Sequence, residues 1–325
     1  MIESRSNTIE DPVWAAEEAR LRVRRIAHLQ WHEDLKARRR WWIASRIKGS
    51  IAAAAAVLAV TLPGRRACGG TLEASEAAGT LIVSAGVLRG PGSGPLPQGS
   101  ELPRGATLVT GGHDRAALRL SGGASVRLNA DTRVVLEDMG LLALTHGALY
   151  VDSVGDGGPS PNLAIRTWLG SLRAAGARFQ VRVRDEALTV GVRQGSVIVD
   201  RDGARQEIES SNELTLTRDG GFRTKRIEPF GPAWDWILDV APEFVLEGRT
   251  LGEFLDWLSA ETGLRVRLAG ESSEGDLTGI VLHGSIAGVR PDRTPDAVLP
   301  ACGLAHRLTM GAIEIGPAAP EHDRR

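Results

Sequence analysis

The sequence has few of the residues that build metal centres, disulfide scaffolds or aromatic-rich cores. Among 325 residues there are two cysteines, seven histidines and only 4% aromatic residues. Two cysteines cannot supply a zinc site with four cysteine ligands, and they cannot staple a small disulfide-rich domain. Basic residues number 39 and acidic residues 40, so no bulk charge attracts nucleic acid or anionic lipid. We therefore expect no metal, no cofactor and no direct contact with nucleic acid.

What is abundant is glycine, together with short apolar runs. The chain has 39 glycines, 42% hydrophobic residues and 24% charged residues, which is typical of a globular protein with about two domains. Turn residues interrupt the Val/Leu-rich runs about every eight to twelve residues. This pattern favours many short strands joined by tight turns, and hence a mainly β fold.

One apolar run and the basic residues before it predict a single transmembrane helix over residues 49–64. The run is shorter than the roughly 20 apolar residues that usually span a bilayer. Arg46 and Lys48 can extend it by reaching the headgroups, where Trp41 and Trp42 also fit. Ten arginines and lysines lie between residues 20 and 48, and only Arg65 and Arg66 follow directly. This asymmetry predicts a cytoplasmic amino terminus. A buried Ala-rich helix is the alternative.

Within the basic amphipathic segment 1–48, residues 11–46 have a helical pattern. Apolar side chains, Trp14 among them, recur between charged ones. Such a helix can lie on the inner leaflet or bind a partner, and a solvated juxtamembrane helix is an equal alternative.

The middle of the chain predicts strand after strand, with no helix. Leu118, Leu120, Val126 and Leu128 keep the two-residue period of half-buried strands, while Arg119 and Arg127 take alternate positions. Glycines, Gly147 among them, mark the predicted turns. The predicted strands are 106–109, 116–120, 125–128, 133–136, 141–144, 148–151, 163–167, 171–174, 178–183, 188–192, 196–200 and 213–217.

Several strings follow one another in this segment, namely Leu108-Val-Thr-Gly111, Arg115-Ala-Ala-Leu-Arg-Leu120, Gly122 to Thr132, Leu144 to Val151, Leu163 to Val181 and Val190 to Val199. In this order they resemble the FecR domain, and the resemblance covers about residues 105–220. The sequence departs from that pattern at Gly122-Gly123, Gly176-Ala177 and Asn212, all of which are turn positions. The resemblance implies a β-domain that is solenoid-like or sandwich-like.

The carboxy-terminal part predicts a doubled β-α-β unit. A strand at 244–247 precedes a helix that Thr250 and Glu253 open as a capping box and Gly263 ends, and a strand at 264–268 follows. The pattern returns as a strand at 280–286, a helix opened by Thr294 with Ala297 and Leu299 facing inward, and strands at 303–308 and 312–315. This unit is similar to the small STN module of secretins and signalling TonB-dependent transporters. Its open edge can pair with a partner's strand, for which the candidates are Ala312, Ile313, Glu314 and Ile315.

Other candidate sites are few. Trp234 and Trp236 mark a segment between the two domains, where interdomain packing is favoured over a partner-binding role. Cys68 and Cys302 both follow the predicted membrane segment, which allows one disulfide.

No nucleophile, base and orienting group form a recognised catalytic signature, and the histidines are isolated. We expect no enzyme and no small-molecule substrate.

Together these patterns divide the chain into seven segments. They are a cytoplasmic segment 1–48, a transmembrane helix 49–64, a periplasmic stalk with the first strands 65–104, a FecR-like β-domain 105–228, a hinge 229–242, an STN-like domain 243–317 and a tail 318–325.

The resemblance implies a single-pass regulator of the bacterial inner membrane, with a cytoplasmic amino terminus and periplasmic carboxy-terminal domains. It would receive a signal from the signalling domain of a TonB-dependent transporter and pass it, as an anti-sigma regulator, to an extracytoplasmic-function sigma factor. The family's cytoplasmic domain is longer and richer in a Trp-containing helical signature than residues 1–48, of which only Trp14 and Trp31 resemble that signature. These two residues are the candidates for the sigma-factor contact, and a chain that keeps the sensor half with a replaced output half is the alternative. The alternative is a membrane-anchored envelope scaffold that binds peptidoglycan, polysaccharide or a secretion component.

Overall fold

The computed structural model describes residues 77–90, 94–154, 163–174, 176–268 and 277–318. All of them belong to one compact unit, Glu73–Arg325. The predictions for the segment before residue 77, including the membrane helix at 49–64 and the roles of Trp14, Trp31 and Cys68, lie outside the described residues. Within the described part of the chain, no helix is both long and apolar enough to cross a membrane.

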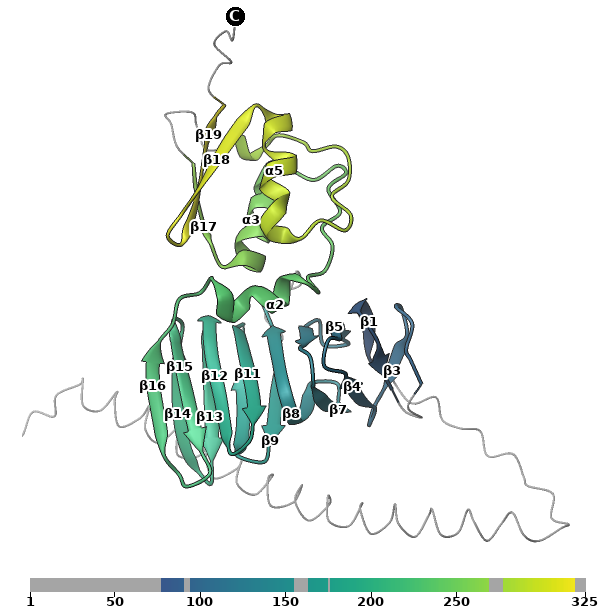
Figure 1. Ribbon diagram of the computed structural model, residues 1–325, viewed down its shortest axis with the longest axis vertical. Helices are drawn as coiled ribbons and strands as arrows, with labels where there is room; N and C mark the ends of the chain where they lie inside the picture. The colour runs from purple at the N-terminus through teal and green to yellow at the C-terminus, as the bar shows by residue number, and fades with distance from the viewer. Residues whose placement is uncertain (1–76, 91–93, 155–162, 175, 269–276, 319–325) are drawn as a thin grey trace, which may run out of the picture. The chain divides into compact units, whose positions relative to one another are not determined.

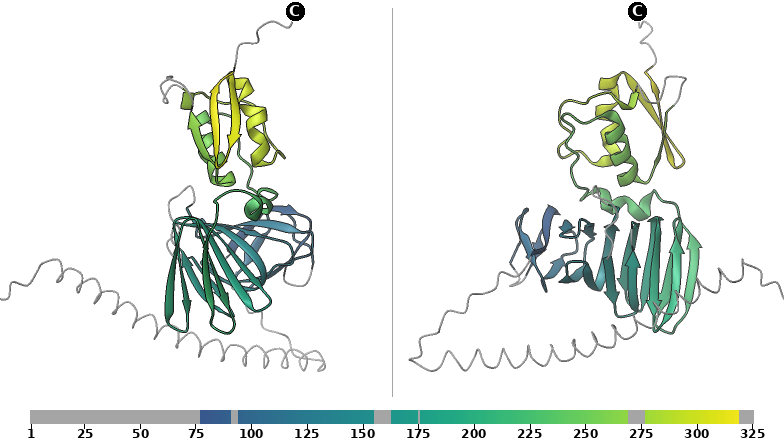
Figure 2. Two further views of the ribbon diagram at one scale, coloured as in Figure 1. Left: turned by 60° about the vertical axis from the view of Figure 1, so that its left-hand side comes forward. Right: turned by 180° about the vertical axis from the view of Figure 1, so that it is seen from behind.

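Residues 77–226 form a β-domain, and neighbouring strands lie side by side along it (Figures 1 and 2). Its strands are β1 (Ala77–Ala85), β2 (Leu88–Arg89), β3 (Glu101–Pro103), β4 (Thr107–Thr110), β5 (Arg115–Leu120), β6 (Ser125–Leu128), β7 (Arg133–Asp138), β8 (Leu141–Asp152), β9 (Leu163–Thr167), β10 (Gly170–Ala174), β11 (Arg178–Arg184), β12 (Ala187–Gln194), β13 (Ser196–Arg201), β14 (Ala204–Glu209), β15 (Asn212–Thr217) and β16 (Phe222–Arg226).

Two sheets enclose one apolar core. The first has the order β3-β1-β5-β6-β8-β11-β12-β15-β16, and the second the order β2-β4-β7-β8-β9-β10-β13-β14. All neighbours are antiparallel except β8 and β9. Leu118, Val126, Leu128, Val181 and Val190 all point into the core and are fully buried, as the two-residue period predicts. The mainly β prediction for this region is confirmed.

Strand β8 belongs to both sheets because it bends at Gly147. The prediction of two strands with a turn between them is wrong here, since one continuous strand runs through the glycine. Gly147 has a φ of 94°, and a Cβ atom on it would lie 2.4 Å from the Thr132 Oγ1 atom and 2.6 Å from the Asp131 carbonyl oxygen. Glycine is needed at this point both for its backbone angle and for the close approach.

The sequence did not predict β14 and β16. In β14 only Ile208 is buried, and all five residues of β16 are exposed. Strands without a buried face lack the alternating pattern on which the prediction depends.

The carboxy-terminal domain is small and mixed. It contains α3 (Leu251–Thr262), β17 (Arg265–Leu268), η2 (Pro291–Arg293), α5 (Thr294–Val298), η3 (Pro300–Cys302), β18 (Leu304–Thr309) and β19 (Ala312–Pro317). The sheet order is β17-β19-β18, with β17 parallel and β18 antiparallel to β19. Figure 1 shows α3 and α5 beside this sheet.

Helix α3 begins and ends as predicted. The Thr250 hydroxyl accepts a hydrogen bond from the Glu253 amide at 3.2 Å, and the Glu253 carboxylate accepts one from the Thr250 amide at 2.8 Å. These two bonds complete the capping box. Gly263 ends the helix in the left-handed conformation, with a φ of 74°. The buried face of the helix contains Leu251, Phe254, Leu255 and Leu258.

Two predicted strands in this domain are absent. Residues 244–247 and 280–286 are loops, linked by an isolated bridge between Thr250 and Val281 and by hydrogen bonds such as that from the Gly284 amide to the Glu247 carboxylate. Their apolar residues Leu246, Leu282 and Ile286 are nevertheless buried in the domain core. A short apolar run looks the same in the sequence whether a loop or a strand buries it. The repeated unit is therefore a helix, a glycine in the left-handed backbone conformation and a strand.

Two further expectations are corrected. Ala297 is exposed, whereas Leu299 is fully buried, because α5 is a single turn that presents Val298 and Leu299 to the core. The segment Ala312–Ile315 is not an open edge. It lies in β19, the central strand, whose backbone is already hydrogen-bonded to β17 and β18. Ala312, Ile313 and Ile315 are buried.

Candidate functional site at the junction of the two domains

The outer face of the first sheet carries buried polar side chains, although it points away from the core. The strand register places Arg127 on β6 opposite Tyr150 on β8, and Tyr150 opposite Gln180 on β11. Their exposed fractions are 1%, 1% and 4%. An outer face this buried must be covered by another part of the chain.

The segment between the two domains provides part of that cover. It forms η1 (Pro232–Trp234) and α2 (Asp235–Leu238), and Trp234 and Ile237 pack with Tyr150 in one apolar cluster. The Trp234 indole meets the Tyr150 ring edge-on, with 6.2 Å between ring centroids. The Trp234 indole nitrogen donates a hydrogen bond to the Glu228 carbonyl at 2.8 Å. This segment is thus packed onto the β-domain.

The carboxy-terminal domain provides the rest through the end of α3. Both terminal nitrogens of Arg127 reach the Glu261 carboxylate, each at 2.7 Å. The Nη1 atom of Arg127 also donates to the Ile237 carbonyl at 2.9 Å. The exposed fractions of the two side chains are 2% for Arg127 and 9% for Glu261. A desolvated ion pair, with one hydrogen bond between its two side chains, therefore joins the two domains.

A second arginine reinforces this contact. Arg193 on β12 donates from Nη1 to the backbone carbonyl of Glu261 at 2.9 Å. Its guanidinium lies 4.5 Å from the centre of the Trp234 ring and 5.7 Å from that of Tyr150. Such cation-π contacts favour the charged guanidinium away from water. We call Arg127, Tyr150, Arg193, Trp234 and Glu261 the junction cluster.

Burial and charge act in opposite directions on the pKa values of the cluster. Burial alone would lower the pKa of Arg127, but the adjacent Glu261 carboxylate outweighs this effect and raises the pKa above its usual value. Burial lowers the pKa of Arg193, and the neighbouring Tyr150 and Glu261 offset this effect only in part. Burial raises the pKa of Tyr150, so its phenol stays neutral. Arg127 therefore stays charged, and the adjacent Glu261 carboxylate compensates that charge.

A close backbone approach adds to the fit. A Cβ atom on Gly263 would lie 2.0 Å from the Pro229 carbonyl oxygen and 3.0 Å from the Arg193 Nε atom. Glycine at this position therefore both ends α3 and lets the helix end reach the segment before η1.

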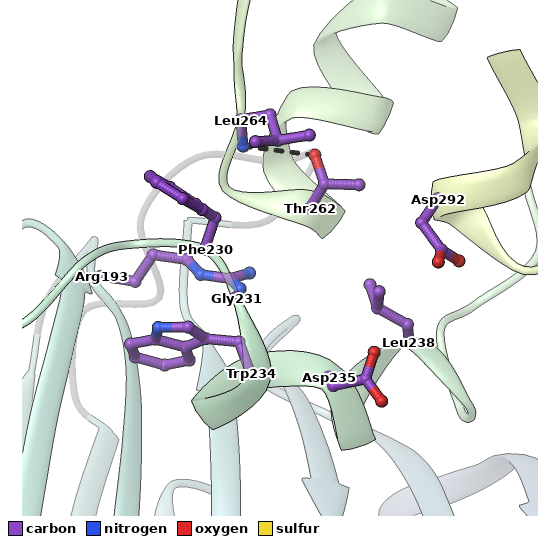
Figure 3. A pocket seen from close by; sticks show the side chains of 9 residues that line it. All are labelled: Arg193, Phe230, Gly231, Trp234, Asp235, Leu238, Thr262, Leu264 and Asp292. Carbon is purple, nitrogen blue, oxygen red and sulfur yellow. Dashed lines mark hydrogen bonds between the residues drawn. The ribbon is translucent and has the colours of Figure 1, made fainter. Parts of the chain in front are cut away.

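A small cavity of about 180 Å³ borders the junction cluster, and Figure 3 shows the Arg193 guanidinium above the Trp234 ring at its wall. The lining residues are Arg193, Phe230, Gly231, Trp234, Asp235, Leu238, Thr262, Leu264 and Asp292. On the Asp235 side, Arg290 contacts Asp235 at 2.6 Å, Asp239 at 2.7 Å and Asp292 at 2.9 Å. These exposed and half-buried ion pairs form a polar rim around the buried cluster.

The predicted site residues fall in two places. Trp234 and Trp236 both lie at the junction, buried to 1% and 8% exposure, whereas Ala312, Ile313, Glu314 and Ile315 lie in β19. A partner-binding role for any of them stays a prediction. Cys302 is partly buried against the carboxy-terminal core. Among the described residues, no three histidines, cysteines or carboxylates are grouped as metal ligands would be.

Sequence reasoning missed the residues that make the junction. Arg127 occupies an alternate strand position, which predicts an exposed side chain, yet Arg127 is almost fully buried. Arg127 and Glu261 are 134 residues apart, and no local pattern connects them. The available hint is that the chain's single tyrosine, Tyr150, lies on the outer face of a strand, where an aromatic residue needs cover.

Comparison with known proteins agrees with the geometry of the β-domain. Residues 106–198 match the family model described as FecR protein. The FecR resemblance predicted from the sequence is confirmed for this segment, which contains Arg127, Tyr150 and Arg193 of the junction cluster. The match does not include α3 or the rest of the carboxy-terminal domain, so the STN-like assignment stays a prediction. No curated protein matches the chain.

Two solved structures are also similar to the chain. Both are crystal structures, at 2.50 and 1.65 Å resolution, of a candidate anti-sigma factor from Parabacteroides distasonis ATCC 8503. They are 15% and 16% identical to this chain, with TM-scores of 0.34 and 0.35. Each alignment covers 66% of this chain and 99% of the other. A likeness at this level carries no argument about function.

Proposed function

We propose that this chain is a FecR-type regulator that receives a signal at its carboxy-terminal domain and passes it to a sigma factor, without catalysing a reaction. The observation that carries the proposal is the FecR match over residues 106–198. The domain so matched is joined to the carboxy-terminal domain by the buried pair of Arg127 and Glu261.

The junction cluster suits a protein that transmits a binding event. Separating the two domains would leave the Arg127 guanidinium and the Glu261 carboxylate buried without a partner or force both into water. In this proposal the ligand binds the carboxy-terminal domain more tightly when the contact is altered, so that binding also acts on the β-domain.

In this proposal residues 49–64 cross the inner membrane, and the segments beyond them are periplasmic. The support is the short apolar run, with ten basic residues between positions 20 and 48 before it. Residues 1–48 remain in the cytoplasm and hold an extracytoplasmic-function sigma factor, with Trp14 and Trp31 in the contact.

The proposed periplasmic partner is the signalling domain of a TonB-dependent transporter, bound at the STN-like domain. Strand β18 offers a suitable edge, because among the described residues it pairs only with β19. Leu308 at its end is 59% exposed, and Met310 in the following turn is fully exposed. An added strand would satisfy the open backbone groups of β18 and cover these two side chains.

The proposal is tested by capturing partners from solubilised envelopes with the full-length chain and with a chain lacking residues 1–48. Mass spectrometry should identify a sigma factor with the full-length chain only. The full-length chain that carries both Trp14→Ala and Trp31→Ala should no longer capture the sigma factor but should still capture the envelope partners. If both chains capture the same envelope proteins and neither captures a sigma factor, the regulator proposal fails. That result would favour a scaffold that binds peptidoglycan, polysaccharide or a secretion component.

A further inference from the structure

Both sheets of the β-domain end at the same place, with one open strand each. Strand β14 ends the second sheet and β16 ends the first, and within the described residues each is hydrogen-bonded on one side only. The two strands lie close together, since four residues of β14 and Thr224 of β16 line one cleft. A cleft of about 250 Å³ opens between them, lined by Gln206, Glu207, Ile208, Glu209, Asn212 and Thr224.

The inner side of this end is incompletely covered. The register pairs Phe222 of β16 with Leu216 of β15, so both side chains point toward the core side of the sheet. Leu216 is 8% exposed, but Phe222 is 68% exposed. An aromatic side chain on the inward face of an edge strand, beside a cleft, lacks the packing that the next strand would provide.

The two open strands carry opposite charges on their outer faces. Strand β14 presents Glu207 and Glu209, which alternate with the buried Ile208. Strand β16 presents Arg223 and Lys225, which alternate with Phe222 and Thr224. Lys225 contacts Glu213 of its own sheet at 2.8 Å. No ion pair among the described residues involves Arg223, Glu207 or Glu209.

We propose that these two edges bind a second copy of this chain, with β14 of each copy against β16 of the other. Because both strands lie at one end of the domain, a single two-fold axis can satisfy both contacts at once. Each sheet would then continue across the interface, with Glu207 and Glu209 beside the partner's Arg223 and Lys225. Phe222 would enter the partner's cleft, next to the partner's Ile208.

The same charges disfavour the other pairings of these edges. Two copies of β16 side by side would bring Arg223 and Lys225 against one another, and two copies of β14 would oppose Glu207 and Glu209. Like charges directly opposite each other destabilise a strand pair. The side chains therefore favour the pairing of β14 with β16, in which acidic residues lie beside basic ones. A second copy of this chain supplies both of these strands.

The test is the oligomeric state of the full-length chain in detergent, measured by analytical ultracentrifugation under reducing conditions to exclude disulfide-linked dimers. The wild type should be a dimer. Either E207K with E209K, or R223E with K225Q, should raise the dissociation constant by about 100-fold, since each alters both symmetric contacts. Phe222→Ser should weaken the dimer by about tenfold through lost burial.

Mixing the two charge variants gives the decisive result. In their heterodimer, the basic β14 of the first variant pairs with the acidic β16 of the second, and the other contact keeps the wild-type charges. Dimers should therefore form in the mixture but not in either variant alone. The matched control is R182Q with R184E, the same charge change on the outer face of the central strand β11, which should leave the dimer intact. A monomeric wild type, or a mixture that remains monomeric while both variants fold, overturns the proposal.

Discussion

The two domains of this chain differ in how much of their stability they can supply alone. Among the described residues, the β-domain has a core of 35 buried apolar residues between two sheets, whereas the carboxy-terminal domain has 12. In the same ranges the small domain forms three strands and places much of its chain in loops. Helix α3 serves both domains, because Leu251, Phe254 and Leu258 face its own core while Glu261 reaches into the β-domain.

This difference shows that a small domain can obtain order from a larger neighbour without sharing a hydrophobic core with it. The contact between them is polar at its centre, with Arg127, Arg193 and Glu261, and aromatic around it, with Tyr150 and Trp234. Such a contact is costly to break on one side, because removing either Arg127 or Glu261 leaves the other charge buried without its partner.

The largest effect is expected from a charge in the large core. Leu128→Asp places a carboxylate where the side chain is fully buried, and we expect a loss above about 4 kcal/mol that unfolds the β-domain. Leu308→Asp, at a site 59% exposed in the small domain, should change stability by less than about 0.5 kcal/mol. Thermal melting by circular dichroism distinguishes them. Unchanged melting of Leu128→Asp would show that β6 is not a core strand.

The next largest effect should come from Arg127, which precedes Leu128 in β6 and faces the junction. Arg127→Ala leaves Glu261 buried without a partner and should cost about 3 to 5 kcal/mol. Arg115→Ala removes an ion pair to Asp239 whose side chains are about 30% exposed, and should cost at most about 1 kcal/mol. In denaturant, the small domain of Arg127→Ala should unfold in a transition separate from that of the β-domain. Equal effects for both arginines would mean that the junction has no special role.

A glycine comparison within the β-domain should give an intermediate effect. Gly147→Ala brings a Cβ atom to 2.4 Å from Thr132 at a φ of 94°, so we expect a loss of about 3 kcal/mol. Gly123→Ala has a similar φ of 88° but open space around it, and should cost only about 1 kcal/mol. Chemical denaturation of both variants measures the difference. Similar losses would show that the bend in β8 does not depend on close packing.

Removal of the helix cap should have a small effect that is confined to the small domain. Thr250→Ala takes away the hydroxyl that accepts the Glu253 amide and should cost about 1 kcal/mol. Hydrogen exchange should become faster in the first turn of α3 and remain unchanged in the β-domain. Faster exchange across β6 and β8 as well would contradict an independent core in the β-domain.

The smallest effect is a pH dependence from the same cap. The backbone amide of Thr250, followed by Arg249, lowers the pKa of Glu253 below its usual 4.5. A lowered folded-state pKa stabilises the fold above the usual value, and this contribution is lost as pH falls through the lowered one. Glu253→Gln should therefore be less stable than wild type at neutral pH and equal to it in acid. An unchanged difference across that range would contradict the cap's electrostatic role.

The sequence was informative where burial repeats locally. Alternating residues such as Leu118, Val126 and Leu128 located most strands of the β-domain, and Thr250, Glu253 and Gly263 located both ends of α3. These signals succeed because a strand or a helix end imposes its own spacing on neighbouring residues.

The candidate site could not be located in this way, because its parts come from β6, β8, β12, η1 and α3. A buried ion pair depends on which elements meet, and the positions of Arg127 and Glu261 are those of ordinary exposed residues in a strand and a helix. The exposed strands β14 and β16 were missed for a related reason, since their pairing partners and not their own sequences hold them in the sheet.

The most direct test of the account is a double-mutant cycle across the junction, using Arg127→Met, Glu261→Leu and the two together. Each single variant leaves one charge buried without a partner, while the double variant leaves none. The account predicts that the double variant is more stable than the sum of the single losses implies, by about 2 to 3 kcal/mol in denaturant unfolding. Single losses that add to within about 0.5 kcal/mol would contradict it, because the two domains would then not be coupled through this pair.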